Sequence, residues 1–343
     1  AAVAAYILAL PITGTIRPQL FGMPGFALVL WAVARIKFNS HPLIWLPLLF
    51  AFWANVHGSF AMGLVVLGCF ALAETWNAAR SSGSSQRIWT ATGPQRAWAA
   101  VLLATAGSCV NPLGFNLLLA TAGFGGNPNL DGISEWQPMV LGSLSGALFM
   151  ASLVATAVLL RWSPRRIAAF EILLTLVFGL ASLWAIRMLV WWALAWPWVV
   201  APHAAATWLL HHRSRRQLNE TDPIRGVKRL VYGAIIVFLA IWWSPSTFGL
   251  ITGHRRAEES ILSSGTPHSI ACKIHEMGLS GRIFTPLDWA DYIIFETDEA
   301  VRPLIFSHVH LTHPSVWRDY NRINAAGETW LDVVDKHEID YLV

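Results

Sequence analysis

Long apolar runs separated by short polar segments fill the first 250 residues of the chain. A helix needs about 20 apolar residues to cross a bilayer, because lipid offers no partner to an unpaired backbone group. Nine runs approach this length, at roughly 1–15, 19–36, 42–56, 58–77, 97–110, 139–160, 167–185, 187–209 and 230–248. The pattern therefore predicts an α-helical polytopic membrane protein with about nine transmembrane helices. The first run has no basic flank, so we expect an incomplete N-terminus rather than a signal peptide.

A different pattern begins near residue 257, where short apolar runs alternate with polar residues. It predicts strands at 282–285 and 304–307 and a closing strand before the C-terminus, with helices at 287–296, 315–325 and 330–336. Strands that alternate with helices favour a partly parallel sheet. We therefore expect two domains, a transmembrane helical domain over 1–250 and a small α/β domain over 257–343.

The composition supports this division of the chain. The sequence is 55% hydrophobic and 13% charged, whereas a soluble domain carries about 25% charged residues. Residues 1–256 hold 18 Lys and Arg against 6 Asp and Glu, and the remaining residues hold 6 against 14. The cations follow the ends of apolar runs, so the basic character indicates membrane loops and no nucleic-acid partner.

Loop charge predicts the orientation of the spans. One set of alternating loops carries 14 Lys and Arg, and the opposite set carries only Arg17 and Arg187 before the end of the last span. Positive loops stay in the cytoplasm. We therefore expect a multi-pass protein of the bacterial inner membrane, in contact with its lipids, with the 110–138 loop and the C-terminal domain outside. Arg255 and Arg256 are the discordant pair.

A polar group at membrane depth costs free energy, so each such residue needs a reason and is a candidate site residue. Arg17 could hold a lipid-linked phosphate, or it could be a helix-end Arg whose charge reaches the membrane surface. His57 follows Asn55 in the segment Trp53-Ala54-Asn55-Val56-His57-Gly58-Ser59. The imidazole and the amide could bind a substrate, or they could be hydrogen-bonded structural groups. Glu74 and Glu171 lie beside basic loops, and we expect only structural roles for them.

The predicted outer loop 110–138 carries the candidate catalytic carboxylates, Asp131 and Glu135. A loop of this length is often functional. Glu135 precedes Trp136, so a carboxylate for sugar hydroxyls or proton transfer stands next to an aromatic platform. The alternative is a surface loop with an interfacial Trp. Arg187 lies between two spans, and we expect it to pair with Glu135 or with a phosphate.

Three histidines in the C-terminal domain, His308, His310 and His313, have metal-like spacing. In a strand, His308 and His310 would share one face. Zinc needs three or four ligands, and no cysteine is near in sequence. We therefore predict that the C-terminal domain binds no zinc and that these histidines form a polar strand edge at its surface. The chain has only three cysteines, which exclude a disulfide framework.

The motifs Arg17-Pro18-Gln19, Trp53 to Ser59, Asn111-Pro112-Leu113-Gly114 and Glu135-Trp136 resemble those of uncharacterised bacterial multi-span membrane proteins related to the GT-C glycosyltransferases. The resemblance implies a polyprenyl-phosphate-linked sugar as donor outside the membrane, and it leaves a divalent metal open. GT-C enzymes carry their key acidic residue in the first outer loop, which this chain lacks, so the resemblance assigns no catalytic base.

Two functions follow from these patterns. In the first, the protein is a GT-C-like transferase in which Arg17, His57, Asn55, Trp136 and Arg187 bind the lipid phosphate and its sugar, and Glu135 or Asp131 deprotonates the acceptor. In the second, it is a non-catalytic membrane subunit or docking protein that packs against other subunits of a membrane complex. A shared cavity lined by the outer polar groups favours the first, and burial of those groups against each other favours the second.

Overall fold

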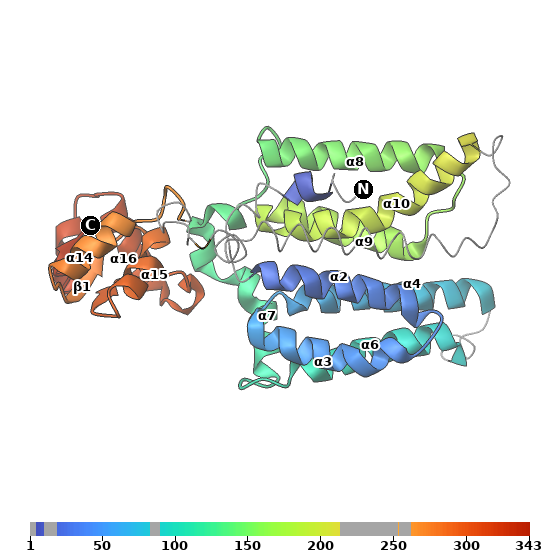
Figure 1. Ribbon diagram of the computed structural model, residues 1–343, viewed down its shortest axis with the longest axis horizontal. Coiled ribbons are helices and arrows are strands. Elements are labelled where there is room, and N and C mark those ends of the chain that lie inside the picture. The colour runs from blue at the N-terminus through green and yellow to red at the C-terminus, as the bar shows by residue number, and fades with distance from the viewer. Residues whose placement is uncertain (1–4, 10–18, 83–89, 213–252, 254–261) are drawn as a thin grey trace. The chain divides into compact units, whose positions relative to one another are not determined.

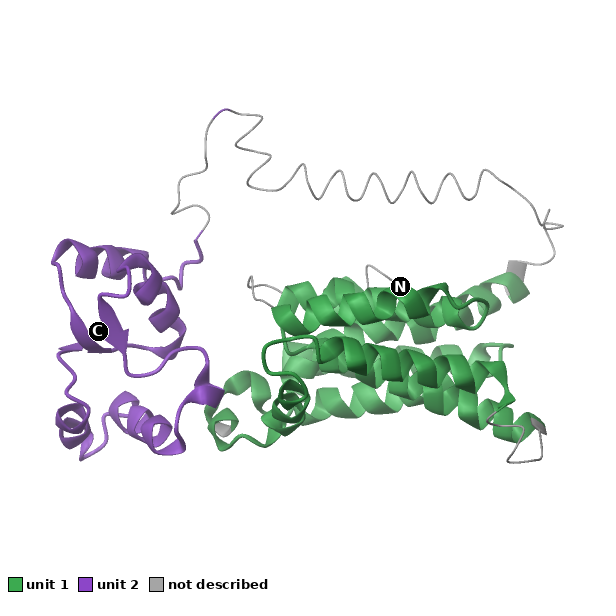
Figure 2. Ribbon diagram, turned by 90° about the horizontal axis from the view of Figure 1, so that it is seen from below, with its two compact units in different colours: residues 1–215 green, residues 216–343 purple. Residues whose placement is uncertain are grey.

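The computed structural model describes residues 5–9, 19–82, 90–212, 253 and 262–343. The chain divides into two compact units, residues 1–215 and 216–343, which Figure 2 shows in different colours. Each unit is described by itself below. Arg17 and the predicted ninth span at 230–248 lie outside the described residues, as does most of the predicted first span.

The first unit is a helix bundle (Figure 1). Seven of the nine predicted spans coincide with described helices, although α6 begins five residues before its predicted start and α8 begins five residues after it. These helices are α2 (Gln19–Ile36), α3 (His41–Val56), α4 (Phe60–Ser82), α6 (Thr92–Ser108), α8 (Leu144–Trp162), α9 (Ala169–Trp184) and α10 (Leu189–His212). Helices α2, α3, α4 and α6 pack together, as do α8, α9 and α10, and contacts of α9 with α4 and of α10 with α2 join the two groups.

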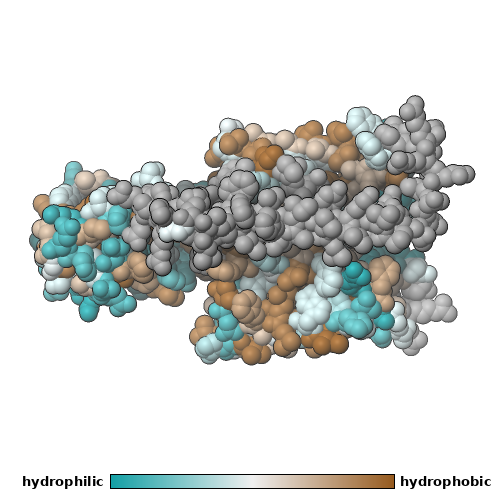
Figure 3. Space-filling view, in the orientation of Figure 1, coloured by the Kyte–Doolittle hydropathy of each residue, from teal (hydrophilic) through white to brown (hydrophobic). Residues whose placement is uncertain are grey.

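Three of the described helices are long and apolar enough to cross a membrane: Gln19–Ile36, Phe60–Ser81 and Leu144–Trp162. Helices α3 and α9 are apolar but shorter. Large apolar side chains point outward over the bundle, and brown hydrophobic residues cover much of its visible described surface in Figure 3. Exposed apolar side chains of this extent are typical of a surface that faces lipid.

The first helix group packs closely around Trp53, whose side chain is buried. Its ring lies between Gly25 of α2 and Gly63 of α4, and a Cβ atom at either glycine would come within 2.8 Å of it. The indole N–H donates a hydrogen bond to the Ser59 hydroxyl, 3.0 Å away. Small residues at helix crossings let backbones approach in this way in membrane bundles. The Trp53 to Ser59 motif is thus partly a packing motif.

Helices α8 and α10 run in the same direction and are joined by three polar contacts in a common register. Trp192 donates to Ser152 and Trp196 donates to Thr156, each over 2.8 Å. His203 Nδ1 lies 2.9 Å from the Ser163 hydroxyl. Each pair is 40 residues apart, so two parallel helices present matching polar positions at the same interval. Side-chain hydrogen bonds between helices are one source of cohesion where water is excluded.

Most of the described Lys and Arg residues of this unit gather at one end of the bundle, which we call the basic end, and Arg187 is the exception. Those at the basic end belong to the last turns of α2, α4 and α8, the N-terminal part of α6 and the links that follow α2 and α8: Arg35, Lys37, Arg80, Arg96, Arg161, Arg165 and Arg166. The α3–α4 turn, the 110–143 loop and the α9–α10 link lie at the opposite end, which we call the His57 end. This segregation matches the loop pattern predicted from sequence.

The second unit is a small α/β domain. Its helices are α14 (His268–Glu276), α15 (Leu287–Glu296), α16 (Pro314–Asn324) and α17 (Trp330–Lys336). Strands β1 (Gly281–Phe284), β2 (Val301–Pro303) and β3 (Tyr341–Leu342) form a parallel sheet in the order β2-β1-β3. Gly281 pairs with Val301, and Ile283 pairs with Tyr341. The core beneath the sheet includes Ile274 and Ile293.

The predicted elements of this unit are confirmed except at two places. Residues 304–307 are not the second strand, because that strand is Val301–Pro303. His308 and His310 do not share a strand face either, since Val309–Leu311 is a 3-10 helix. The Leu304 N–H still donates to the Ile283 carbonyl of β1 over 3.0 Å, and Ile305 is buried beyond the end of β2, which explains why the pattern resembles a strand. Helix α14 is an element that the sequence patterns did not predict.

Candidate functional site

The long loop at the His57 end is fixed to the bundle by two asparagine amides. Asn55 Nδ2 donates to the carbonyl oxygens of Ala51 and Val110, over 2.8 and 2.7 Å. Asn111 Nδ2 donates to the Ser108 carbonyl, and its Oδ1 accepts from the Leu113 N–H. The amide N–H groups of Asn55 tie the start of the loop to α3, which is one of the two roles that the sequence left open, and substrate binding by Asn55 stays a prediction.

The end of the same loop is fastened to the α9–α10 link. The Met139 N–H donates to the Leu183 carbonyl over 3.1 Å, and the Ile186 N–H donates to the Gln137 carbonyl over 3.2 Å. These bonds place the short 3-10 helices η3 (Ser134–Trp136) and η4 (Ile186–Met188) side by side. The backbone, rather than side-chain attraction alone, therefore brings Glu135 to Arg187.

Arg187 and Glu135 form an ion pair, with 3.2 Å between Nη1 and Oε2. The pairing predicted for Arg187 is thus present. The two side chains keep 25% and 29% of their surface exposed. A pair with this exposure remains within reach of a ligand, which distinguishes it from a closed internal ion pair.

Aromatic rings surround the guanidinium. Arg187 Cζ lies 5.5 Å from the centre of the Trp136 ring, within the range of a cation–π contact. The Trp136 ring also contacts Phe124 and Trp184, with centroids 5.2 and 6.1 Å apart. Neither Phe124 nor Trp184 was predicted from the sequence to belong to this site. Trp184 stands three residues before Arg187, and that spacing is the signal that could have identified it.

His57 lies close enough to Arg187 for that charge to affect its ring. Burial lowers the pKa of His57 below its ordinary value, and the positive charge of Arg187 lowers it further. The Ser59 N–H donates to His57 Nδ1 over 3.0 Å. A neutral imidazole that accepts at Nδ1 carries its proton on Nε2. His57 is therefore a neutral hydrogen-bond donor at neutral pH. We call His57, Glu135, Trp136 and Arg187 the Arg187 cluster.

Two predicted site residues cannot be placed in this cluster. Arg17 lies outside the described residues. Asp131 belongs to the 3-10 helix η2 (Pro128–Gly132), four residues before Glu135, but the position of its side chain is not described. Of the predicted outer polar groups, Glu135 and Arg187 meet in an ion pair, and His57 lies within electrostatic reach of that pair. A cavity shared by these groups stays a prediction.

A second polar group lies at the basic end. Glu171 is buried, and its carboxylate contacts Arg165 over 2.5 Å and the Ala168 N–H over 2.8 Å. The buried His203 ring lies 3.3 Å from the same carboxylate. Glu74 pairs with Lys37 over 2.9 Å. Both carboxylates are thus engaged by neighbouring groups, which agrees with the structural roles predicted for them.

Comparison with known proteins assigns no family to this chain, since no model of a known protein family matches it and no curated protein sequence matches it either.

Proposed function

We propose that this protein is a GT-C-like membrane glycosyltransferase of the bacterial inner membrane, and that the Arg187 cluster binds a lipid-phosphate-linked sugar at the outer face. The observation that carries the proposal is the partly exposed Arg187–Glu135 ion pair beside Trp136. It joins an anion-binding cation, a carboxylate and an aromatic platform on two neighbouring short helices. The resemblance of the quoted motifs to GT-C relatives supports the same chemistry.

Arg187 is the proposed phosphate ligand. A guanidinium matches phosphate and carboxylate oxygens equally well with its fork of N–H groups. An incoming lipid phosphate therefore competes with Glu135 for Arg187. Arg17 would add a second cation if its loop lies at the same end, as the topology predicts. His57 contributes a neutral Nε2–H donor, which can hydrogen-bond to a phosphate or sugar oxygen without adding charge.

Glu135 is the proposed general base. In the free protein, the guanidinium of Arg187 contacts the Glu135 carboxylate over 3.2 Å. When the phosphate takes over the guanidinium, that carboxylate oxygen becomes available to the acceptor hydroxyl. It then removes the proton of the acceptor hydroxyl, and that oxygen attacks the sugar carbon. The carbon–oxygen bond to phosphate breaks, and Arg187 stabilises the charge on the departing lipid phosphate. Asp131 is the alternative base.

Trp136 is the proposed sugar platform. Its ring is half-buried and is supported by Phe124 and Trp184. The apolar face of a sugar ring packs on such a surface, and hydrophobic contact area then contributes to binding. Because the Trp136 ring is half-buried, its neighbours hold it in place while part of its surface remains accessible to a ligand.

The alternative function is a non-catalytic membrane subunit or docking protein, and one observation favours it. Arg187 and Glu135 already neutralise each other, and Trp136 already packs against other rings. These contacts can have the purely structural role of holding the long loop against the α9–α10 link, and we call this role the latch. In that case the cluster would bind no lipid phosphate, and the protein would act through contacts with other subunits.

Mass spectrometry of lipids that purify with the full chain separates the two functions. The transferase proposal predicts a polyprenyl-phosphate-linked sugar bound to the wild type and absent from Arg187→Ala, with both proteins folded. Ordinary phospholipids in both samples, together with a lower unfolding temperature for Arg187→Ala, would support the latch and contradict the transferase. Arg161→Ala, an exposed substitution at the basic end, is the matched control and should keep the bound lipid.

A further inference from the structure

Two pairs of polar side chains face each other across helices α14 and α15 of the C-terminal unit. His268 and Cys272 are four residues apart on α14, and Tyr292 and Glu296 are four residues apart on α15. Residues at this interval lie on the same face of a helix. The two helices pack against each other, so the faces meet. All four side chains are half-buried, neither sealed in the core nor fully in water.

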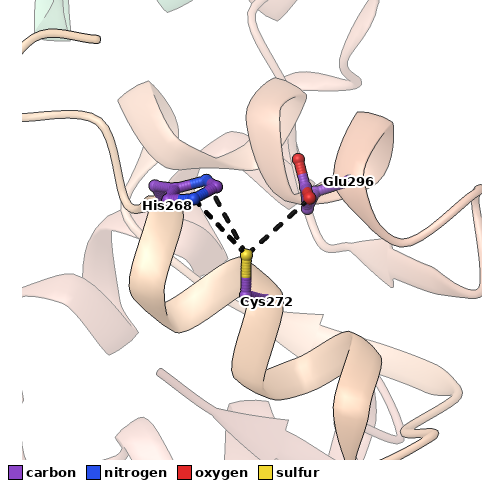
Figure 4. A group of neighbouring side chains, drawn as sticks. All are labelled: His268, Cys272 and Glu296. Atoms are coloured by element: carbon purple, nitrogen blue, oxygen red, sulfur yellow. Dashed lines mark hydrogen bonds between the residues drawn. The ribbon is translucent and has the colours of Figure 1, made fainter. Parts of the chain in front are cut away.

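The distances among these groups match those of a metal centre (Figure 4). Cys272 Sγ lies 3.7 Å from each nitrogen of His268 and 3.8 Å from Oε1 of Glu296. In tetrahedral zinc sites the metal–sulfur bond is about 2.3 Å and the bonds to nitrogen and oxygen are about 2.0–2.2 Å, which places the ligand atoms about 3.6 Å apart. Within the described part of the chain, these three are the one set of His, Cys and acidic side chains whose ligand atoms lie within 4.8 Å of one another.

We propose that His268, Cys272 and Glu296 bind a divalent transition metal of the zinc type. Thiolate, imidazole and carboxylate together suit zinc and exclude magnesium or calcium, which prefer oxygen ligands alone. Three protein ligands leave a fourth position for water or another ligand, as in zinc sites that remain open to a substrate. On binding, the thiol loses its proton to solvent and the sulfur forms a bond to the metal, so one proton is released per ion.

Tyr292 completes the arrangement as a positioning residue. Its hydroxyl lies 2.8 Å from His268 Nδ1. A ligating histidine commonly donates its other ring N–H to a neighbouring oxygen, and that bond fixes which nitrogen faces the metal. In this site Nδ1–H donates to the Tyr292 oxygen and Nε2 binds the ion. Nε2 already lies 3.7 Å from Cys272 Sγ, so it can bind the ion while Nδ1 keeps its bond to Tyr292.

This site differs from the histidines for which sequence predicts no zinc. His308 and His310 are exposed, and their ring centroids are 5.9 Å apart on a 3-10 helix. The proposed site instead combines residues 24 and 28 positions apart, which the packing of α14 on α15 brings together. It is also independent of the Arg187 cluster, which belongs to the other unit. Failure of the proposed transferase function would therefore leave the metal site untouched.

Cobalt titration of the purified full-length protein tests the site. The protein is stripped with a chelator in detergent and titrated with Co²⁺, whose absorption reports thiolate ligation. We expect one equivalent to give a thiolate-to-cobalt charge-transfer band, and Zn²⁺ to displace it. Cys272→Ser should abolish the band. Cys109→Ser removes another half-buried cysteine, and His310→Ala removes an exposed histidine, so both should keep it.

Two further variants cover the case in which Cys272→Ser fails to fold. Glu296→Gln removes a ligand charge, and it should weaken cobalt binding by at least tenfold. Tyr292→Phe should weaken it by about 10- to 100-fold, as loss of a hydrogen-bond partner of a ligating histidine does at other metal sites. The proposal is overturned if the wild type shows no thiolate band. It is equally overturned if the band survives in a folded Cys272→Ser protein or disappears in His310→Ala.

Discussion

The guanidinium of Arg187 lies 3.2 Å from the carboxylate of Glu135, although the two residues are 52 positions apart in the chain. With about a quarter of each side chain exposed, such a pair contributes only about 0–1 kcal/mol to stability, because water screens the charges. The backbone bonds between the 134–139 segment and the 183–186 segment already hold the two parts together. Stability alone is therefore a weak reason for the pair, and ligand binding is a stronger one.

Replacement of Glu135 should separate binding from chemistry. Glu135→Gln keeps the shape of the side chain but removes the proposed base, so we expect lipid-phosphate binding to persist and sugar transfer to stop. Release of Arg187 from its carboxylate partner should leave binding equal to or tighter than that of the wild type. The unfolding free energy should change by less than about 1 kcal/mol.

The matched variant for this experiment is Asp131→Asn, which removes the other carboxylate of the same loop. Full transfer activity in Glu135→Gln together with none in Asp131→Asn would assign the base to Asp131. Activity in both variants would contradict the assignment of a base to this loop. Transfer is measured with membranes that supply the natural lipid-linked donor.

Packing around Trp53 can be tested with two glycines of the same helix. Gly63→Ala places a methyl group 2.8 Å from the Trp53 ring, and overpacking of this kind costs about 1–3 kcal/mol. Gly68 has no heavy atom within 4 Å of a Cβ atom, so Gly68→Ala should stabilise α4 by about 0.5–1 kcal/mol. Unfolding temperatures in detergent report the difference. Equal effects of the two substitutions would contradict the packing described for α2, α3 and α4.

Acid should destabilise the C-terminal unit through Asp319. This buried carboxylate contacts Lys336 Nζ over 2.6 Å and His337 Nε2 over 2.8 Å. The hydrogen bonds from Lys336 and His337 hold the pKa of Asp319 below its ordinary value of 3.8. Because the pKa of Asp319 is lower in the folded protein than in the unfolded chain, the ionised carboxylate stabilises the fold. This stabilisation is fully present above pH 3.8 and is lost as the pH falls through the pKa of Asp319 in the folded protein.

The measurement is hydrogen exchange of α16 peptides in the full chain, with variants compared at equal pH so that intrinsic exchange rates cancel. The protection of α16 in the wild type should fall below about pH 4. Asp319→Asn should show weaker protection at neutral pH and should lose this acid dependence. Asp332→Asn, an exposed carboxylate of α17, should behave as the wild type does. An unchanged acid response in Asp319→Asn would exclude Asp319 as its source.

Orientation in the membrane is tested by cysteine labelling. Ser40 lies at the basic end and Leu113 lies at the His57 end, and both are exposed. With the native cysteines replaced, we expect Ser40→Cys to be labelled only from the cytoplasm, and Leu113→Cys and His308→Cys only from outside. Labelling of Ser40→Cys and Leu113→Cys from the same side would contradict the orientation derived from the loop cations.

The helical bundle could be predicted because its signal is local. Apolar length and loop charge are properties of consecutive residues, and seven predicted spans accordingly match described helices. Residues 304–307 show where a local signal misleads, because β2 ends at Pro303 and Ile305 is buried beyond the end of that strand. Burial sets hydrophobic periodicity, whereas strand pairing depends on a partner elsewhere in the chain.

The candidate site was predictable only in part. A charged side chain at membrane depth is costly in free energy, so Arg187 and Glu135 were predicted to need a partner. The structure pairs them with each other. The partner of Asn55 could not be predicted, because its bond to the Val110 carbonyl joins residues 55 positions apart and no sequence spacing reveals it. The His268, Cys272 and Glu296 set was missed for the same reason, since it depends on how α14 packs against α15.

Titration of polyprenyl phosphate into the full-length protein in lipid nanodiscs tests the central claim most directly. A charge-assisted hydrogen bond contributes about 1.5–3 kcal/mol, so Arg187→Ala should raise the Kd by about 10- to 100-fold. Arg161→Ala should leave the Kd unchanged, and both variants should keep the wild-type unfolding temperature within a few degrees. Equal affinity in the wild type and Arg187→Ala, or a large loss of thermal stability in Arg187→Ala, would contradict a phosphate site at the Arg187 cluster.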